Sequence, residues 1–199
     1  MAELPLVIYL GQRTAPSTGV PTYTGQGDLK FALNAGQGEF PRIVSAPGDP
    51  QEAIIRTQEA LYLSSKYRTP AIVLGDKHLG ESGYSFDEIK KSPLSNKRFI
   101  LENPPNKYLS YKITASGVSP CLVPGQGPVV RANSYEHNEA GNTIEDESSI
   151  IEMNDKRMKK LKHLKREVAK LKTFSVFGKG KNLLVAWGST KGAVIDVLP

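Results

Sequence analysis

Three short apolar stretches decide the fold of this chain: LPLVIYL at residues 4–10, RIVSA at residues 42–46 and PAIVLGD at residues 70–76. Each stretch is short for a helix, and each is predicted to be a strand. The run at residues 4–10 is continuously apolar and rich in branched and aromatic side chains. That composition is typical of a strand buried on both faces, as in a parallel sheet.

Helices are predicted between these strands. Asp49 can cap a helix over about residues 51–66, with Pro50 in its first turn and Glu52 three residues after the cap. A shorter helix is predicted within residues 27–35. Because strands alternate with helices, we expect an α/β fold in which crossover helices connect parallel strands.

The remainder of the chain differs in character. Many Gly, Pro, Ser and Asn residues and no sustained period mark residues 77–142 as irregular. A strand is predicted at residues 182–187 (NLLVAW), then a tight turn and a helix at residues 193–198. We therefore divide the chain into the latter part of an α/β domain (1–90), an irregular connector (91–142), a basic amphipathic helix (143–173) and the first strand and helix of a second α/β domain (174–199).

Positive charge is concentrated in the basic segment. Nine Lys or Arg residues lie between Lys156 and Lys172 against one acid, Glu167, although the whole chain has 26 basic and 20 acidic residues. Apolar residues recur there every three or four positions, as on one face of a helix: Met158, Leu161, Leu164, Val168 and Leu171. We interpret the segment as a surface helix docked by this stripe, its lysines solvated or facing an acidic partner subunit. The alternatives are a helix that binds nucleic acid and one that binds a membrane surface. Thr143 followed by Asp146 fits a capping pair upstream of it.

Composition excludes several classes of protein. The 199 residues are 39% hydrophobic and 23% charged, as in folded globular proteins. One cysteine, Cys121, excludes a disulfide framework and an iron–sulfur cluster held by this chain alone. No apolar run approaches the roughly 18 residues that span a bilayer, and the basic segment lacks interleaved aromatic residues for base stacking. We expect a cytoplasmic protein that binds neither nucleic acid nor a membrane.

The loop after the first strand holds the candidate site. In an open α/β sheet, ligands bind beyond the carboxyl ends of the strands, and Arg13 lies three residues past Leu10. A guanidinium there can hold a small carboxylate through two parallel hydrogen bonds. The hydroxyls of Ser17, Thr18 and Thr22 could bind an adjacent oxo group. The alternative is a surface loop with a structural arginine.

Other chemically suggestive residues are better explained without a site. His137 lies between carboxylates but has no second histidine nearby, so we expect a hydrogen-bonded loop rather than a metal site. His78, at a strand end, could touch a cofactor or a partner. Cys121 has no adjacent base and is not expected to be a nucleophile. The turn at residues 188–192 lacks the full phosphate-binding pattern, so a packing turn is expected.

Eight blocks, in order along nearly the whole chain, closely resemble the α subunit of 2-oxoacid:ferredoxin oxidoreductases. They are QRTAPSTGVPT (12–22), QGDL (26–29), GEFPR (38–42), APGD (46–49), DKHLGES (76–82), SYEHN (134–138), DKRM (155–158) and WGSTKG (187–192). Any single block would be weak evidence. Departures from the family's pattern are Ala15 for glycine, Gln37 for histidine and Cys121 for arginine.

The resemblance implies a thiamine diphosphate enzyme that decarboxylates a 2-oxoacid, transfers the acyl group to coenzyme A and passes electrons to ferredoxin. It implies that Arg13 holds the substrate carboxylate and that Thr22 lines the pocket for the substrate side chain. The chain resembles the central part of such a subunit, with an incomplete pyrimidine-type domain. The family's catalytic glutamate is therefore expected before its first residue, and the C-terminal domain is expected to continue past Pro199.

The resemblance further implies that partner subunits hold most of the cofactors, namely thiamine diphosphate, Mg²⁺ and the [4Fe-4S] clusters. The implied partners are the β subunit and ferredoxin, and coenzyme A is the co-substrate. The expected function is that of an α subunit, or a portion of one, which needs its partner for activity. The alternative is a shortened, non-catalytic relative that serves as an assembly or binding module.

Overall fold

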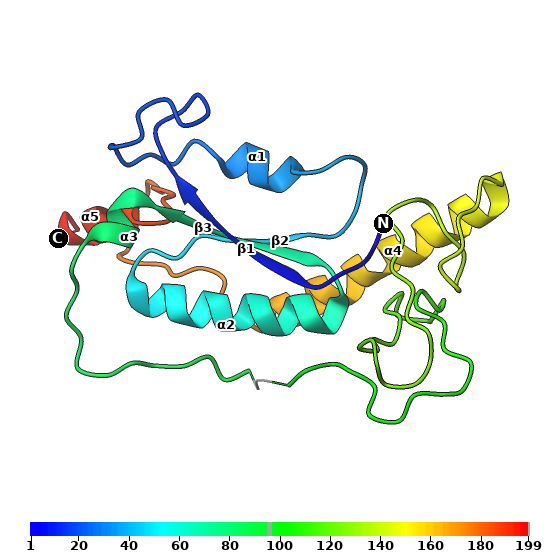
Figure 1. The fold of residues 1–199 in the computed structure, drawn as a ribbon. Coiled ribbons are helices and arrows are strands. Elements are labelled where there is room, and N and C mark those ends of the chain that lie inside the picture. The colour runs from blue at the N-terminus through cyan, green and yellow to red at the C-terminus, as the bar shows by residue number, and fades with distance from the viewer. Residues whose placement is uncertain (95–96, 199) are drawn as a thin grey trace.

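Three parallel strands form the sheet of this computed structural model, which describes residues 1–94 and 97–198 (Figure 1). The strands are β1 (Leu6–Gln12), β2 (Ile43–Ser45) and β3 (Pro70–Asp76), in the order β1-β3-β2. Leu6 is paired with Pro70 and Gln12 with Asp76. The predicted α/β class with a parallel sheet is confirmed.

Two helices connect the strands and lie on opposite sides of the sheet (Figure 1). The helix α1 (Leu29–Asn34) packs its Ala32 against Ile72 and Leu74. The helix α2 (Pro50–Tyr67) packs Ala60 against the other face of β3, at Ala71 and Val73. Alternate residues of β3 thus face α1 and α2, which is why this central strand is buried along almost its whole length.

The first strand is less buried than its sequence predicts. Leu6, Ile8 and Tyr9 of β1 are exposed, because β1 is an edge strand of the described sheet. The helix above it, α1, has six residues and covers only the carboxyl end of β1, at Leu10. The expectation of burial on both faces is therefore wrong for the N-terminal half of β1.

The predicted strand at residues 182–187 is also wrong. These residues form no strand, and Leu183, Leu184 and Val185 are 71–84% exposed. A strand needs a neighbour to pair its backbone groups, and none of the described strands pairs with this segment. The helix that follows, α5 (Thr190–Asp196), begins three residues earlier than predicted.

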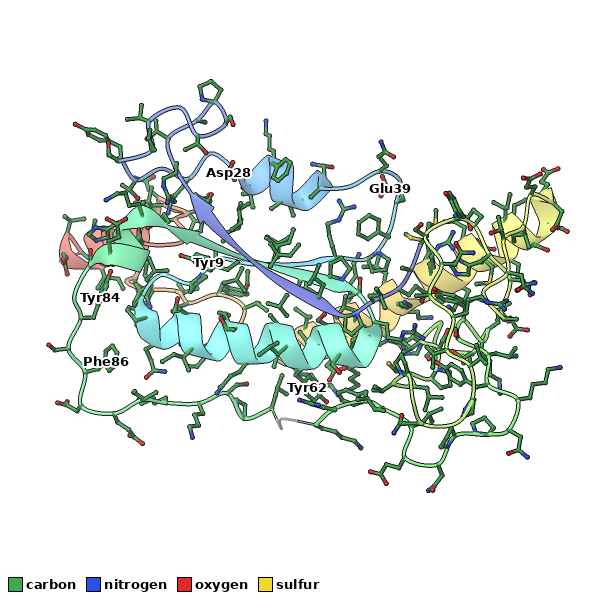
Figure 2. The ribbon with its side chains drawn as sticks, in the orientation of Figure 1. Tyr9, Asp28, Glu39, Tyr62, Tyr84 and Phe86 are labelled. Carbon is green, nitrogen blue, oxygen red and sulfur yellow. The ribbon has the colours of Figure 1, made fainter. Side chains whose placement is uncertain are left out.

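One short helix was not predicted. The helix α3 (Lys77–Glu81) begins directly after β3, because the side chain of Asp76 accepts a hydrogen bond from the Leu79 backbone N–H at 2.9 Å. From residue 82 to residue 146 the described residues form no further helix or sheet strand. This stretch runs past α2 and folds beside the basic helix (Figure 1). Tyr84 and Phe86 lie on its first part (Figure 2).

The basic helix, α4, extends from Glu147 to Val168. Asp146 alone caps it, by accepting a hydrogen bond from Ser149, and Thr143 lies outside the helix, so the predicted capping pair is wrong. Leu164 of the predicted apolar stripe packs against Leu63 of α2.

Three cations of α4 are not on its solvent face. Lys156, Arg157 and Lys160 are buried, contrary to the expectation that the basic residues are solvated or face another subunit. Both lysines form ion pairs with Glu3, and Arg157 binds Glu136 at 2.8 Å. A buried charge requires such a partner, and Glu3 lies too far away in the sequence to be recognised as one. None of the described helices is long and apolar enough to cross a membrane.

Candidate functional site at the carboxyl edge of the sheet

The three strands end at one edge of the sheet, where their connecting loops meet. The strands β1, β2 and β3 end at Gln12, Ser45 and Asp76. Gln12 and Asp76 are almost fully buried although both are polar. Gln12 receives a hydrogen bond from the backbone N–H of Asp28, the residue that precedes α1 (Figure 2). The edge is thus built from polar side chains whose partners are fixed, at the position where α/β proteins bind ligands.

Arg13 follows β1 directly and holds the loop that begins there. Its Nε donates to the carbonyl of Pro21, and its Nη1 donates to the carbonyl of Gly11, both at 3.0 Å. Within the described residues, Nη2 donates to no other group. The guanidinium is therefore oriented by its own loop while one nitrogen keeps its hydrogens for another acceptor.

The last part of the loop, at Thr24 and Gly25, packs closely on Arg13 and Thr14. A Cβ atom on Gly25 would lie 2.8 Å from the Arg13 carbonyl oxygen, so only glycine fits there. The hydroxyl of Thr14 donates to the carbonyl of Thr24 at 3.2 Å. These contacts fix the two ends of the loop against each other.

The three predicted hydroxyl residues lie on the same loop but remain exposed. Ser17, Thr18 and Thr22 are all on its outer part, and Ser17 has a left-handed φ of 50°. The structure thus brings these residues onto one loop with Arg13, but it does not gather them in an enclosed pocket.

Asp76 is the centre of a hydrogen-bond network that sequence reasoning missed. Its Oδ1 caps α3, whereas its Oδ2 accepts from the Ser189 hydroxyl at 2.6 Å and from Gln26 Nε2 at 3.2 Å. Burial alone would raise the pKa of Asp76. The hydrogen bonds from Ser189, Leu79 and Gln26 outweigh this effect and hold the pKa below its ordinary value. The available signal in the sequence was a carboxylate at the end of a buried strand.

Lys191 links the same C-terminal turn to the loop after β2. Its Nζ is 2.6 Å from Asp49 Oδ2 and 2.6 Å from Glu52 Oε1. Burial by itself would lower the pKa of Lys191. Hydrogen bonds to the two carboxylates raise the pKa by more than burial lowers it, so the net shift is upward. This pair of contacts was also missed, because α2 and the turn are far apart in the sequence.

The loop of residues 13–26 is called the Arg13 loop below. Two cavities lie away from Arg13 and the exposed hydroxyl residues of this loop. One, of about 350 Å³, lies between β2, α2 and residues 168–191. The other, of about 400 Å³, is lined by the end of α2, residues 116–121 and His163. Neither cavity is lined by Arg13, Ser17, Thr18 or Thr22.

The other sequence candidates have local partners. His78 is exposed, with its Nδ1 3.3 Å from the Ser82 hydroxyl. His137 is fully buried, binds the Tyr135 carbonyl through Nδ1 at 2.8 Å and stacks on Tyr111, with the ring centroids 3.7 Å apart. Burial lowers the pKa of His137. Cys121 is a partly buried free thiol.

Comparisons with known proteins give a consistent picture. Residues 1–156 match the family model described as pyruvate flavodoxin/ferredoxin oxidoreductase, thiamine diP-bdg. The chain is 39% identical over its whole length to subunit alpha of 2-oxoacid:ferredoxin oxidoreductase 1 from Sulfurisphaera tokodaii. It is 40% identical to the 2-oxoacid:ferredoxin oxidoreductase subunit alpha of Saccharolobus solfataricus. It covers 32% of the length of each of these relatives.

A solved structure extends the likeness to three dimensions. With a TM-score of 0.78 and 30% sequence identity, 98% of the chain superposes on a 2-oxoglutarate:ferredoxin oxidoreductase from Magnetococcus marinus. That structure is described as having 2-oxoglutarate, coenzyme A and succinyl-CoA bound, and the chain covers 34% of the matched polypeptide.

Proposed function

Since the chain belongs to the pyruvate flavodoxin/ferredoxin oxidoreductase family and is homologous to 2-oxoacid:ferredoxin oxidoreductase α subunits, we propose that it supplies the substrate side of such an enzyme. The reaction is the oxidative decarboxylation of a 2-oxoacid, in which coenzyme A takes the acyl group and ferredoxin takes the electrons. The chain spans about a third of the length of its curated relatives. The remaining catalytic and cofactor-binding groups that the reaction needs come from other polypeptides.

The observation that carries this proposal is the position of Arg13. Its guanidinium follows β1 at the carboxyl edge of the sheet and is oriented by the Gly11 and Pro21 carbonyls. Nη2 is then available to the carboxylate of a 2-oxoacid, which a fixed cation can orient against a cofactor. The hydroxyls of Thr22, Ser17 and Thr18 lie on the same loop and contact the remainder of the substrate.

The cofactors are held largely outside this chain. Thiamine diphosphate supplies the carbanion chemistry that breaks the bond to CO2. Its Mg²⁺ needs several oxygen ligands, but the described residues contain no group of three His, Cys, Asp or Glu residues that could hold a metal ion. The single cysteine cannot bind a [4Fe-4S] cluster. From the likeness to α subunits of 2-oxoacid:ferredoxin oxidoreductases, we infer that a β subunit provides these sites and that ferredoxin is the electron acceptor.

Replacing Arg13 tests the proposed substrate role. Arg13→Ala in the assembled enzyme is expected to raise KM for the 2-oxoacid roughly 10- to 100-fold, since a hydrogen bond to a charged group contributes about 1.5–3 kcal/mol. KM for coenzyme A, which binds elsewhere, should stay unchanged. Steady-state ferredoxin reduction measures both constants.

The matched control is Arg98→Ala, because Arg98 is an exposed arginine far from the Arg13 loop in the sequence. It should leave both constants within twofold of the wild type. Equal 2-oxoacid KM values for the Arg13→Ala and wild-type enzymes would show that Arg13 does not hold the substrate.

A further inference from the structure

One turn near the C-terminus contacts residues at or after the carboxyl end of each of the three strands. It comprises residues 187–191 and is called the clamp turn below. Gln26, after β1, donates through Nε2 to the Trp187 carbonyl at 2.9 Å. Lys191 binds the loop after β2, and Ser189 binds Asp76 at the end of β3. The turn thus connects the carboxyl ends of all three described strands through hydrogen bonds and an ion pair.

The clamp turn packs against backbone as well as against polar side chains. Gly188 has a φ of 64°, and a Cβ atom there would lie 2.6 Å from Gln26 Nε2. A Cβ atom on Gly48 would lie 2.8 Å from Lys191 Cβ and 2.9 Å from the Gly188 carbonyl oxygen. Only glycine permits this approach at both positions, so the turn has little room to shift relative to Gln26 and Gly48.

Contacts continue from the clamp turn to the Arg13 loop. Gln26 Nε2 is shared between the Trp187 carbonyl and Asp76 Oδ2, which anchors the end of the loop. The preceding residue Gly25 lies against the backbone of Arg13 and Thr14, and the carbonyl of Thr24 accepts a hydrogen bond from the Thr14 hydroxyl. Anchoring Gln26 therefore fixes the backbone from which the guanidinium extends.

We propose that the clamp turn positions the Arg13 loop, and that Ser189 and Asp76 are positioning residues for it. Ser189 acts through Asp76 and Gln26 and touches no substrate. Its importance for substrate binding rests on the function proposed above for Arg13. The structural claim, that the clamp turn orders residues 13–26, does not depend on that function.

Asp76 uses one carboxylate oxygen to cap α3 and the other to contact Ser189 and Gln26, so its capping role and its proposed positioning role can be tested separately. Oδ1 caps α3 through Leu79, whereas Oδ2 faces Ser189 and Gln26. Removing the Ser189 hydroxyl therefore leaves the cap in place and removes one of the hydrogen bonds that fix Oδ2, the oxygen to which Gln26 also donates. The backbone N–H of Ser189, 3.4 Å from the same oxygen, remains.

Amide hydrogen exchange of the full chain tests the proposal without any substrate. In Ser189→Ala we expect exchange at residues 13–26 to accelerate about tenfold, the effect of losing roughly one hydrogen bond. Exchange at residues 77–81 should be unchanged. Ser189→Thr, which keeps the hydroxyl, should restore the wild-type rates at residues 13–26.

The matched control is Ser148→Ala, because the Ser148 hydroxyl binds only Asp146 at the exposed start of α4. It should leave residues 13–26 at wild-type rates. Unchanged exchange at these residues in Ser189→Ala would overturn the proposal, and so would an equal acceleration throughout β1, β2 and β3, which indicates general destabilisation.

A kinetic comparison then connects the clamp turn to the substrate. In the assembled enzyme, Ser189→Ala should raise KM for the 2-oxoacid several-fold and change kcat less than twofold, because the reacting groups remain in place. A loss confined to kcat would contradict a positioning role. Failure of the proposed function would appear instead as wild-type enzyme that turns over no 2-oxoacid, whatever the exchange rates show.

Discussion

Glu3 lies between the side chains of Lys156 and Lys160, and all three are buried together. Burial by itself would raise the pKa of Glu3. The two lysines lower the pKa by more than burial raises it, so the net shift is downward. Burial lowers the pKa of Lys156 to about 8 in spite of Glu3. The ion pairs attach the segment that enters β1 to α4, so residues at opposite ends of the chain share one buried cluster. Removing one member of such a cluster leaves an unpaired buried charge.

His137 belongs to the neighbourhood of this cluster, and it makes stability depend on pH. Burial is the largest cause of its lowered pKa, and Arg157 and Lys156 lower it further. The folded chain thus binds fewer protons at His137 than the unfolded chain does, so its contribution to stability is lost as the pH falls below the ordinary value of 6.5.

We predict that the free energy of unfolding decreases between pH 7 and pH 5, and that His137→Gln shows a smaller decrease. Urea unfolding at a series of pH values measures this dependence. His78→Gln, at an exposed histidine, should keep the full dependence. An identical pH dependence in wild type and His137→Gln would refute the assignment.

At the scale of elements, the stretch between α3 and α4 is held to α4 by close contact at Gly117. This glycine has a φ of 77°, and a Cβ atom there would lie 2.2 Å from the carbonyl oxygen of Lys156. Because that atom belongs to the backbone of α4, neither partner can move aside without displacing the helix.

We predict that Gly117→Ala lowers the free energy of unfolding by about 3 kcal/mol, of which about 1 kcal/mol is backbone strain and the rest is the clash. Gly127→Ala is the matched control, because Gly127 has a φ of 104° but nothing within 4 Å of its Cβ position. The control should show the strain alone. Equal losses in the two variants, measured by urea unfolding, would show that Gly117 does not pack against α4.

Elements with local signals could be predicted from the sequence. Asp49, Pro50 and Glu52 placed α2 correctly, and the apolar run at residues 70–76 identified β3. Errors arose where long-range contacts decide. Residues 182–187 have the composition of a strand but no described partner strand, and the lysines of α4 are buried only because Glu3 comes from the other end of the chain.

The candidate site also has a part that the sequence predicts and a part that depends on long-range contacts. The position of Arg13 follows from the end of β1, which an apolar run reveals. The partners of Arg13 and the network around Asp76 depend on how loops return to the sheet. Ser189 lies 113 positions from Asp76, a separation at which no local spacing rule indicates a contact.

At the scale of the whole molecule, the described chain leaves much apolar surface uncovered. The exposed residues of β1 lie along one edge of the sheet, and a second exposed group, at residues 174–185, includes Phe174 and Leu183. The loop with Arg13 opens at the same carboxyl edge as the clamp turn, outside both cavities. The function proposed above, in which other polypeptides complete the active site, would account for these features together.

The most direct test of this account is the activity of the native complex beside that of the isolated chain. We predict that the protein purified from its host carries a β subunit and reduces ferredoxin when given a 2-oxoacid and coenzyme A, whereas the chain alone does not. Substantial turnover by the isolated chain would contradict the account. So would a native preparation with neither a β subunit nor activity, as expected of an assembly module.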